Sequence, residues 1–341
     1  MKKVNVLISG SGSLYGVAII QSLLKSKLPL KLVACDVSAR TVGLYLAHQA
    51  YIVPPAHQEE LYLTSLLTII AKENIHAIFV ASSHELAFYS HNKLDIENKT
   101  GAKVFTNFPE TLNLCNDKWL TVNFLKENNF YFPLTIRYPE DQDQLEQFVK
   151  DVQFPIVIKP REGAGSQGLY IVNQYEDLHP LLENKKGIIL QQYLPDNCGE
   201  FTTGICTGAN GRILSGITLK RCLQDGMTMS ADSGDFTEIT DYCKKVAQVL
   251  KPYGPSNFQL RLLSGKPYIF EINPRFSSST GMRSLLGVNE AEILIRAEIL
   301  GEAISQNTIL KCSVIRQYID YLVPTEKIVM LQEKFNMEHE N

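Results

Sequence analysis

The chain has 341 residues and a formal net charge of −3 at pH 7, and its acidic and basic residues are interspersed, which argues against a nucleic-acid or anionic-membrane partner. The length allows two or three subdomains, each with a core of its own. The seven cysteines form no C-x-x-C pair and indicate reduced thiols, and no apolar run is long enough for a signal peptide or a membrane span, so we expect a cytoplasmic protein.

The first part of the chain alternates between patterns typical of strands and of helices. Short apolar runs predict strands at Val4–Ile8, Lys31–Cys35, Ala77–Val80 and Lys103–Phe105. Helices are expected near Val17–Lys25 and Glu59–Glu73. This alternation predicts a parallel α/β sheet within residues 1–112.

A glycine-rich loop follows the first predicted strand. Gly10, Gly12 and Gly16 open a helix, and Asp36 ends the second strand where a ribose-binding carboxylate would lie in a dinucleotide-binding motif. The spacing G-x-G-x-x-x-G is looser than the standard one, so this motif alone is weak. Glu85 lies just past another strand end, where open α/β sheets bind ligands, and we expect it to face an acceptor substrate.

Residues 113–183 contain a glycine-rich hairpin that indicates a phosphate-binding lid. Predicted helices at Trp119–Asn128 and Glu140–Lys150 precede it and complete a small α+β subdomain. Lys159 ends the first strand of the hairpin, before the glycines, whereas a P-loop lysine follows them. Small residues in the loop let backbone N–H groups approach an anion. These are Gly163, Ala164, Gly165, Ser166 and Gly168.

Residues 184–330 predict an antiparallel sheet and a helix around Glu290–Leu300, with residues 331–341 as a tail. One strand stops at Pro195, which leaves backbone N–H and C=O groups that can bind the edge of adenine. This hinge consists of Gln191, Gln192, Tyr193 and Leu194, and Leu190 and Leu194 are expected to pack against the base. Glu200 would then reach the ribose hydroxyls.

Two strands joined by a Gly265-Lys266-Pro267 turn predict a metal site. Residues two apart in a strand share a face, so Glu271, Asn273 and Arg275 are expected on one side and Phe270 on the other. Antiparallel pairing brings Gln259 of the first strand to the same surface. Amide and carboxylate oxygens are ligands that Mg²⁺ prefers, and Mg²⁺ keeps further positions for substrate phosphates.

Together these segments resemble the ATP-grasp superfamily, most closely the ATP-grasp halves of the carbamoyl-phosphate synthase large subunit. The resemblance extends over nearly the whole chain. It implies a mixed α/β and α+β fold with a Rossmann-like N-terminal (pre-ATP-grasp) domain that generally binds no dinucleotide, a small lid subdomain and a C-terminal antiparallel-sheet subdomain. Lys118 and Lys159 would bind the nucleotide phosphates, and Glu200 the ribose. The implied ligands of Mg²⁺, or of Mn²⁺, are Gln259, Glu271 and Asn273.

Gln259 stands where many ATP-grasp ligases have an acid, which removes one negative charge from the second Mg²⁺ site. The resemblance implies an ATP- and Mg²⁺-dependent ligase that joins a small-molecule carboxylate to an amine through an acyl-phosphate, with ATP converted to ADP and phosphate. Arg275 would steady the transferred phosphoryl group or the acyl-phosphate. Lys220 and Arg221, after a predicted strand at Ile213–Leu219, are candidates for contacting the γ-phosphate or the substrate carboxylate, and Lys220 is taken with Arg275 as catalytic.

Two other functions stay open at this point. One is a dinucleotide-dependent oxidoreductase that uses the glycine loop at the N-terminus. The other is a non-catalytic ATP-binding module. We expect no nucleic-acid or membrane partner, and a homodimer is a possible assembly.

Overall fold

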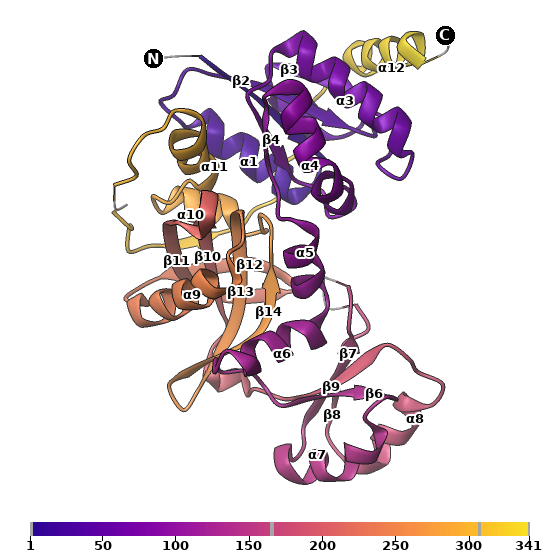
Figure 1. Ribbon diagram of the computed structural model, residues 1–341, viewed down its shortest axis with the longest axis vertical. Coiled ribbons are helices and arrows are strands. Elements are labelled where there is room, and N and C mark those ends of the chain that lie inside the picture. The colour runs from indigo at the N-terminus through magenta and orange to yellow at the C-terminus, as the bar shows by residue number, and fades with distance from the viewer. Residues whose placement is uncertain (1–2, 164–166, 306–307, 340–341) are drawn as a thin grey trace.

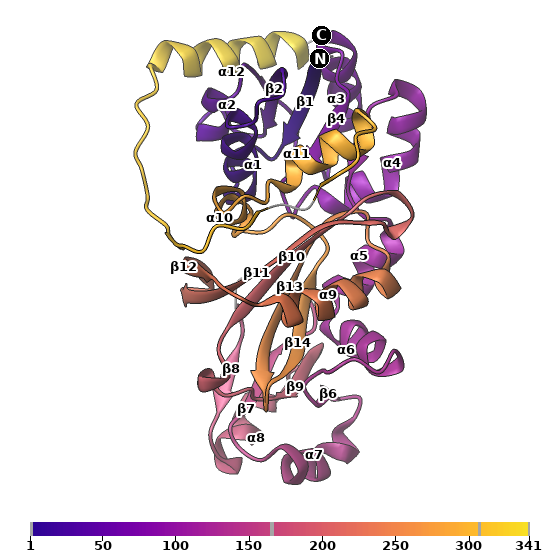
Figure 2. The same cartoon turned by 90° about the vertical axis from the view of Figure 1, so that its left-hand side faces the viewer.

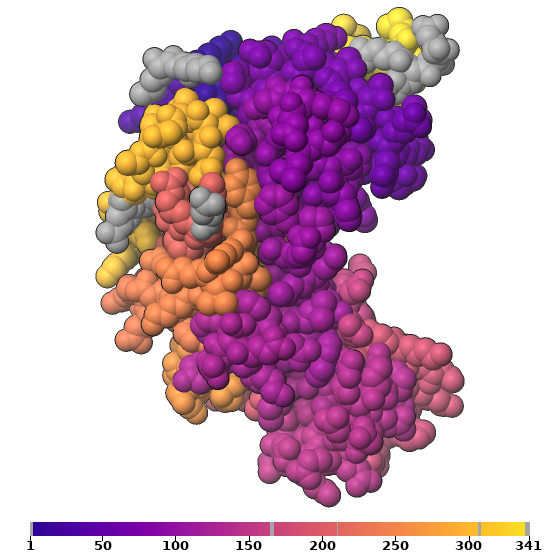
Figure 3. Space-filling model, in the orientation of Figure 1, coloured from indigo at the N-terminus to yellow at the C-terminus, as the bar shows by residue number. Residues whose placement is uncertain are grey.

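The structure is a computed structural model that describes residues 3–163, 167–305 and 308–339. Three units follow one another along the long axis of the molecule (Figure 1). An N-terminal α/β domain lies at one end, a six-stranded sheet lies in the middle, and a four-stranded sheet forms a lobe at the other end. The space-filling view shows this lobe projecting from the rest of the molecule (Figure 3).

The N-terminal domain is a five-stranded parallel sheet in the order β3-β2-β1-β4-β5. Its strands are β1 (Val4–Ser9), β2 (Leu30–Asp36), β3 (Gln49–Ile52), β4 (Ala77–Val80) and β5 (Lys103–Phe105), and its helices are α1 (Leu14–Leu24), α2 (Val42–Leu46), α3 (Glu59–Glu73) and α4 (Leu86–Thr100). Val6 and Ile8 pack with α1, whereas Leu7 packs into a separate core with α3 and α4. Both faces are therefore apolar, as in parallel sheets covered by helices on both sides. The predicted parallel sheet is confirmed, and the edge strand β3 is an addition to it.

Two helices, α5 (Pro109–Asn116) and α6 (Lys118–Glu127), lead from this domain to the lobe. The Asp117 carboxylate caps α6 by accepting hydrogen bonds from the backbone N–H groups of Trp119 (2.8 Å) and Leu120 (3.3 Å). The lobe contains β6 (Thr135–Tyr138), β7 (Ile156–Pro160), β8 (Tyr170–Val172) and β9 (Ile188–Gln192), in the order β6-β9-β7-β8. Its core is closed by α7 (Leu145–Val152) and α8 (Leu178–Leu182).

The middle unit is an antiparallel sheet in the order β14-β13-β10-β11-β12-β15. Its strands are β10 (Phe201–Thr207), β11 (Ile213–Gln224), β12 (Met227–Ser233), β13 (Gly254–Leu263), β14 (Lys266–Asn273) and β15 (Ser313–Ile315). Helix α9 (Thr237–Leu250) packs on one face through a core shared with β10, β13 and β14. Helices α10 (Thr280–Leu285) and α11 (Glu290–Leu294) follow β14, and a π-helical turn (Ile295–Ile299) extends α11 over the predicted helix.

After β15 the chain runs along the outside of the molecule to α12 (Thr325–His339), which lies against the N-terminal domain (Figure 2). The predicted boundary at residue 112 falls inside α5, and the boundary at residue 331 falls inside α12. No helix within the described ranges is long and apolar enough to cross a membrane.

Candidate active site

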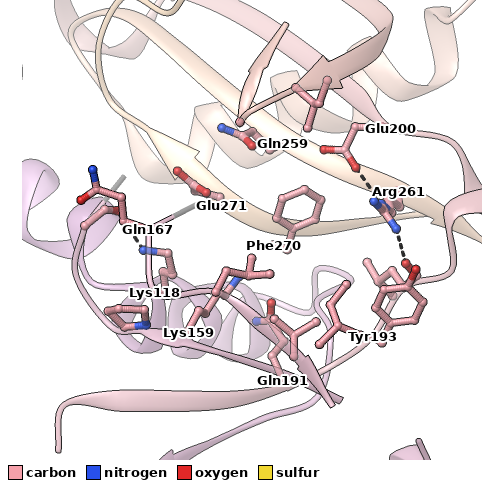
Figure 4. Close-up of a pocket in the computed structure, with 18 of the residues that line it drawn as sticks. Lys118, Lys159, Gln167, Gln191, Tyr193, Glu200, Gln259, Arg261, Phe270 and Glu271 are labelled. Carbon is pink, nitrogen blue, oxygen red and sulfur yellow. Dashed lines mark hydrogen bonds and ion pairs between the residues drawn. The ribbon is translucent and has the colours of Figure 1, made fainter. Parts of the chain in front are cut away.

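A cavity of about 250 Å³ lies between the four-stranded lobe and the six-stranded sheet (Figure 4). Lysine and glutamine side chains from the lobe face carboxylate, amide and guanidinium groups from the sheet. The lining consists of Lys118, Val157, Lys159, Pro160, Glu162, Gly163, Gln167, Leu169, Ile171, Gln191, Gln192, Tyr193, Leu194, Glu200, Arg221, Leu223, Gly226, Gln259, Arg261, Phe270 and Glu271. Residues from segments more than a hundred positions apart thus converge on one mixed polar and apolar cavity.

The glycine-rich hairpin forms one wall of this cavity. Strands β7 and β8 pair antiparallel, so the predicted arrangement of strand, glycine loop and strand is present. Gly163 lines the cavity with φ +120°, a backbone conformation that side-chain-bearing residues rarely adopt. Ala164, Gly165 and Ser166, which were also predicted to bind phosphate, lie outside the described residues.

Lys118 connects the first turn of α6 to this loop. Its side chain is buried, and its Nζ donates a hydrogen bond to the Gly163 carbonyl oxygen over 3.0 Å. The backbone N–H of Lys118 donates to the Arg161 carbonyl oxygen over 3.0 Å. Lys118 therefore lies in the cavity wall, as predicted, and also holds the start of the lid.

Lys159 is 6% exposed and lies 5.5 Å from the centre of the Phe270 ring. Burial lowers the pKa of its ammonium group to about 8, although the Glu271 carboxylate opposes this effect. Lys118 adds to the lowering by like-charge repulsion. The protein therefore holds a cation here at a cost in free energy, which an anionic ligand would relieve.

We expect the stability cost of Lys159 to disappear at high pH. Between the folded pKa of about 8 and the ordinary value of 10.5, the unfolded chain binds more protons than the folded chain, so stability rises with pH in this window. Lys159→Met should raise the melting temperature of the nucleotide-free protein at neutral pH, and this gain should shrink as pH rises through 8. Thermal unfolding of both proteins across the window checks this, and a gain that stays constant with pH would contradict it.

The predicted adenine hinge lies at the end of β9. Gln191 lines the cavity, and its Nε2 donates to the Thr135 hydroxyl over 2.9 Å. Gln192 pairs with Leu134 through its backbone N–H (2.8 Å) and its side-chain oxygen (3.2 Å). Tyr193 and Leu194 also line the cavity. Leu190 was expected to contact adenine but faces away from the cavity into the core of the lobe, because adjacent strand residues alternate between faces.

Glu200, predicted to bind ribose, lies between two arginines in the structure. Arg221 Nη2 donates to Glu200 Oε1 over 2.8 Å, and Arg261 Nε donates to Oε2 over 2.6 Å. Arg261 Nη1 also donates to Asp196 Oδ1 over 2.8 Å and to the Leu194 carbonyl oxygen. No role was predicted for Arg261, although its position two residues after Gln259 on one strand was a signal that both share a face.

The predicted hairpin of polar residues is present in β13 and β14, where Gln259 lies opposite Glu271. The register shifts between Gln259 and Leu260, so that Phe270 is an extra residue in β14. Both Phe270 and Glu271 therefore line the cavity, and the prediction that Phe270 faces the other side is wrong. Strict alternation fails here because a β-bulge places two residues of one strand opposite one residue of the next.

Hydrogen bonds connect the predicted metal ligands to arginines. Asn273 Nδ2 donates to Glu271 Oε1 over 3.0 Å, and Asn273 Oδ1 accepts from Arg275 Nη2 over 2.9 Å. The Arg275 guanidinium lies 4.7 Å from the centre of the Tyr15 ring, which belongs to the N-terminal domain. Asn273 and Arg275 are not among the residues that line the cavity, and their contacts lead from Glu271 towards that domain.

Lys220 does not reach the cavity. It is exposed and lies opposite Phe201, whose side chain packs into the core beneath α9. Its neighbour Arg221 faces the other side, lines the cavity and donates to Gln259 Oε1 over 2.7 Å. Strand alternation therefore puts Lys220, which was predicted to be catalytic, on the face away from the cavity, and Arg221, the other candidate, lines the cavity.

The glycine loop of the N-terminal domain uses its backbone donors internally. The Ser11 N–H donates to the Cys35 carbonyl oxygen, and the Ser13 N–H donates to the Gly10 carbonyl oxygen. The Gly12 N–H donates to Asp36 Oδ2 over 2.7 Å, and the Gly16 N–H donates to the Ser13 hydroxyl over 2.9 Å. These four donors and the Asp36 carboxylate are thus occupied by protein groups, which argues against a dinucleotide at this loop.

Glu85 is buried beneath this loop instead of facing a substrate at the sheet edge. Its side chain is 4% exposed, and Oε1 accepts a hydrogen bond from the Tyr62 hydroxyl over 3.0 Å. Burial raises the pKa of its carboxyl group to about 7, against the effect of the Tyr62 hydrogen bond. The prediction that Glu85 lies just past a strand end is correct. The aromatic residues that enclose it come from α3 and α4, and the position of Glu85 in the sequence does not predict this contact.

Two known domain families together match most of the chain. Residues 115–279 match an ATP-grasp domain, and residues 6–105 match a PylC-like N-terminal domain. The carbamoyl phosphate synthase large chain of Archaeoglobus fulgidus is 22% identical over 199 residues, which cover 52% of this chain and 18% of the relative. The corresponding chain of Clostridium acetobutylicum is 24% identical over 241 residues, covering 66% of this chain and 22% of the relative. The chain thus spans about a fifth of the length of these relatives.

Solved structures share the fold. N5-carboxyaminoimidazole synthetase from Staphylococcus aureus superposes with a TM-score of 0.71 at 18% identity, covering 99% of this chain and 87% of that chain. The biotin carboxylase domain of Hydrogenobacter thermophilus 2-oxoglutarate carboxylase gives a TM-score of 0.66 at 15% identity, covering 86% and 68%. The predicted fold class is confirmed, and the chain contains an ATP-grasp domain at residues 115–279 that follows a PylC-like N-terminal domain at residues 6–105.

Proposed function

We propose that the protein is an ATP- and Mg²⁺-dependent ligase that joins a carboxylate to an amine. The observation that carries this proposal is the buried Lys159 of the lid, which lines the same cavity as Glu271 and Gln259 of the opposite sheet. Within the described ranges Lys159 forms no ion pair, so a polyphosphate chain would supply its missing countercharge. The match of residues 115–279 to an ATP-grasp domain supports the same function.

The cavity fits a magnesium nucleotide in charge and in donor type. Lys118, Lys159, Arg221 and Arg261 supply positive charge around it. Carboxylate and amide oxygens, which Mg²⁺ and Mn²⁺ both accept as ligands, lie at one end. We assign Gln259, Glu271 and Asn273 to the neighbourhood of the ion. Bound there, Mg²⁺ would neutralise part of the phosphate charge.

The residues of the chain act by holding reactants and stabilising charge. Lys118 and Lys159 bind the phosphate chain, and the glycine-rich lid covers it and excludes water. Tyr193 and Leu194 border the adenine end, and Glu200 accepts hydrogen bonds from the ribose hydroxyls. Arg275 lies beyond Glu271, on the side of the N-terminal domain, where it would stabilise the transferred phosphoryl group.

The chemistry takes two steps. A carboxylate oxygen of the substrate bonds to the γ-phosphorus, and the bond from phosphorus to the departing ADP oxygen breaks. The amine then attacks the acyl carbon, phosphate leaves, and the nitrogen loses a proton as the amide forms. Small molecules are the expected partners, and a homodimer stays a prediction.

The products of ATP cleavage test this mechanism. We expect a panel of carboxylates to reveal one that promotes release of ADP and phosphate, never AMP and pyrophosphate. Without an amine, hydroxylamine should trap the acyl-phosphate as a hydroxamate, and oxygen-18 from the carboxylate should appear in the phosphate. Stoichiometric AMP and pyrophosphate would contradict the proposal, because they place the attack on the α-phosphorus.

Nucleotide binding provides the control for this experiment. A ligand at a hundred times its dissociation constant stabilises a protein by about 2.7 kcal/mol, so Mg-ATP or Mg-ADP should raise the melting temperature clearly. NADH and NADPH should leave it unchanged, because the donors of the glycine loop are occupied. Stabilisation by NADH without stabilisation by Mg-ATP would favour an oxidoreductase. Stabilisation by Mg-ATP with no cleavage for any acceptor would favour a non-catalytic module.

A further inference from the structure

Two arginines hold the two amide side chains that flank Glu271. Arg221 Nη2 donates to Gln259 Oε1 over 2.7 Å, and Arg275 Nη2 donates to Asn273 Oδ1 over 2.9 Å. An amide side chain has a single oxygen, with two lone pairs, that a metal ion can bind. In both residues this oxygen already accepts a hydrogen bond from a guanidinium group.

The Arg221 side chain is fixed in place by its surroundings. It is 6% exposed, and the same Nη2 atom also donates to Glu200 Oε1 over 2.8 Å. Its Nε is buried without a hydrogen-bond partner in the described part of the chain. A buried N–H group without a partner costs free energy, which a hydrogen bond to an acceptor oxygen would recover. A phosphate oxygen in the cavity would be such an acceptor.

Charge makes a metal ion bound at Gln259 unfavourable. An ion held by Gln259 Oε1 would share this oxygen with Arg221 Nη2, which lies 2.7 Å away on a side chain that is 6% exposed, and two cations would then lie next to each other. Gln259 carries no negative charge to offset this repulsion. An acid at this position would attract a divalent ion, whereas a neutral amide bonded to arginine does not.

Glu271 differs from both amides. Its Oε1 accepts a hydrogen bond from the neutral amide of Asn273, and no ion pair to it occurs among the described residues. Mg²⁺ is usually held by one or two carboxylates together with substrate phosphates and water. Glu271 alone satisfies this requirement once a nucleotide is bound.

We propose that the protein binds its nucleotide with a single divalent ion, held by Glu271 and the phosphates, and that the guanidinium of Arg221 takes the place of a second ion on the Gln259 side. This proposal rests on the proposed function and narrows its metal site. Arg221 then neutralises phosphate charge permanently, with no dependence on metal concentration.

Counting bound metal ions tests the proposal without any catalytic turnover. Mn²⁺ and the non-hydrolysable β,γ-imido analogue of ATP are added to the full chain, and the bound ions are measured by equilibrium dialysis with electron paramagnetic resonance. We expect one Mn²⁺ for each bound nucleotide in the natural protein. Two Mn²⁺ for each nucleotide would overturn the proposal, whereas no nucleotide binding would instead overturn the proposed function.

Variants distinguish a specific effect of Arg221 on the number of bound ions from the general effect of removing a positive charge. In the double variant Arg221→Met with Gln259→Glu, the ratio should rise to two Mn²⁺ for each nucleotide. Lys220→Met is the matched control, since it removes the adjacent charge on the opposite face of β11 and should leave the ratio at one. A double variant that binds the nucleotide with one Mn²⁺ would show that Arg221 does not replace an ion.

Discussion

Glu271→Gln should reduce turnover at least about a hundredfold, because it removes the carboxylate at the proposed metal position and thereby charge stabilisation needed during phosphoryl transfer. Asn273→Ala should have a similar effect, since Asn273 Nδ2 orients Glu271 Oε1 over 3.0 Å. Both losses should appear in kcat measured as ADP release with the identified carboxylate. The substitution Glu271→Gln keeps the size of the side chain, so a loss of packing would not explain the result.

Two comparisons make this prediction specific. Glu200→Ala should mainly raise the KM for ATP, because the ribose contact exists in the ground state and the transition state alike. Glu238→Gln, which changes an exposed carboxylate in the first turn of α9 on the other face of the sheet, should leave both constants unchanged. A near-normal kcat for Glu271→Gln would mean that the metal ion lies elsewhere.

Arg283→Met should lower the free energy of unfolding by about 3–5 kcal/mol, the usual effect of removing one partner from a buried ion pair. Arg283 and Glu290 are both 0% exposed and lie 2.8 Å apart. Arg283 Nη1 also donates to Ser277 (3.0 Å) and Asn257 (3.3 Å), which connects the pair to β13 and to the loop that follows Arg275. Unfolding by urea, monitored by circular dichroism, measures the change.

The matched control is an ion pair at the surface. Lys99 and Asp95 also lie 2.8 Å apart, but their side chains are 55% and 48% exposed. Asp95→Asn should therefore change stability by no more than about 1 kcal/mol. Equal effects of the two substitutions would contradict this prediction. They would mean that Arg283→Met does not leave Glu290 as an uncompensated buried charge, for example because water enters the site.

Alternation of residues in strands predicted much of the site but not all of it. It placed Gln259 and Glu271 on one surface, as observed, because antiparallel pairing through a short turn brings the polar faces of both strands together. The same rule placed Phe270 on the wrong face, because it assumes an unbroken ladder. The register shift between Gln259 and Leu260 arises from the pairing of the two strands, and the sequence of neither strand predicts it.

The pairing of charges was the part least accessible from the sequence. Glu200 and Arg261 are far apart in the chain, and their contact exists only because β10 and β13 are neighbours in the sheet. The role of the glycine loop was also ambiguous for this reason. Its spacing is compatible with a dinucleotide site, and its occupied donors, such as Gly12 N–H with Asp36 and Gly16 N–H with Ser13, are seen only in the folded structure.

By itself, the sequence determined four strands of the parallel sheet, the strand–glycine loop–strand hairpin with Lys159 before its glycines, and the hairpin that carries Glu271, because these depend on local patterns of apolar, small and polar residues. The tertiary structure alone decided that Arg221, and not Lys220, faces the cavity and that Glu85 is buried. It also decided that the amide side chains of Gln259 and Asn273 each accept a hydrogen bond from an arginine. The physical reason is that burial and charge pairing depend on which distant segments pack together, and the spacing of residues along the chain does not determine that packing.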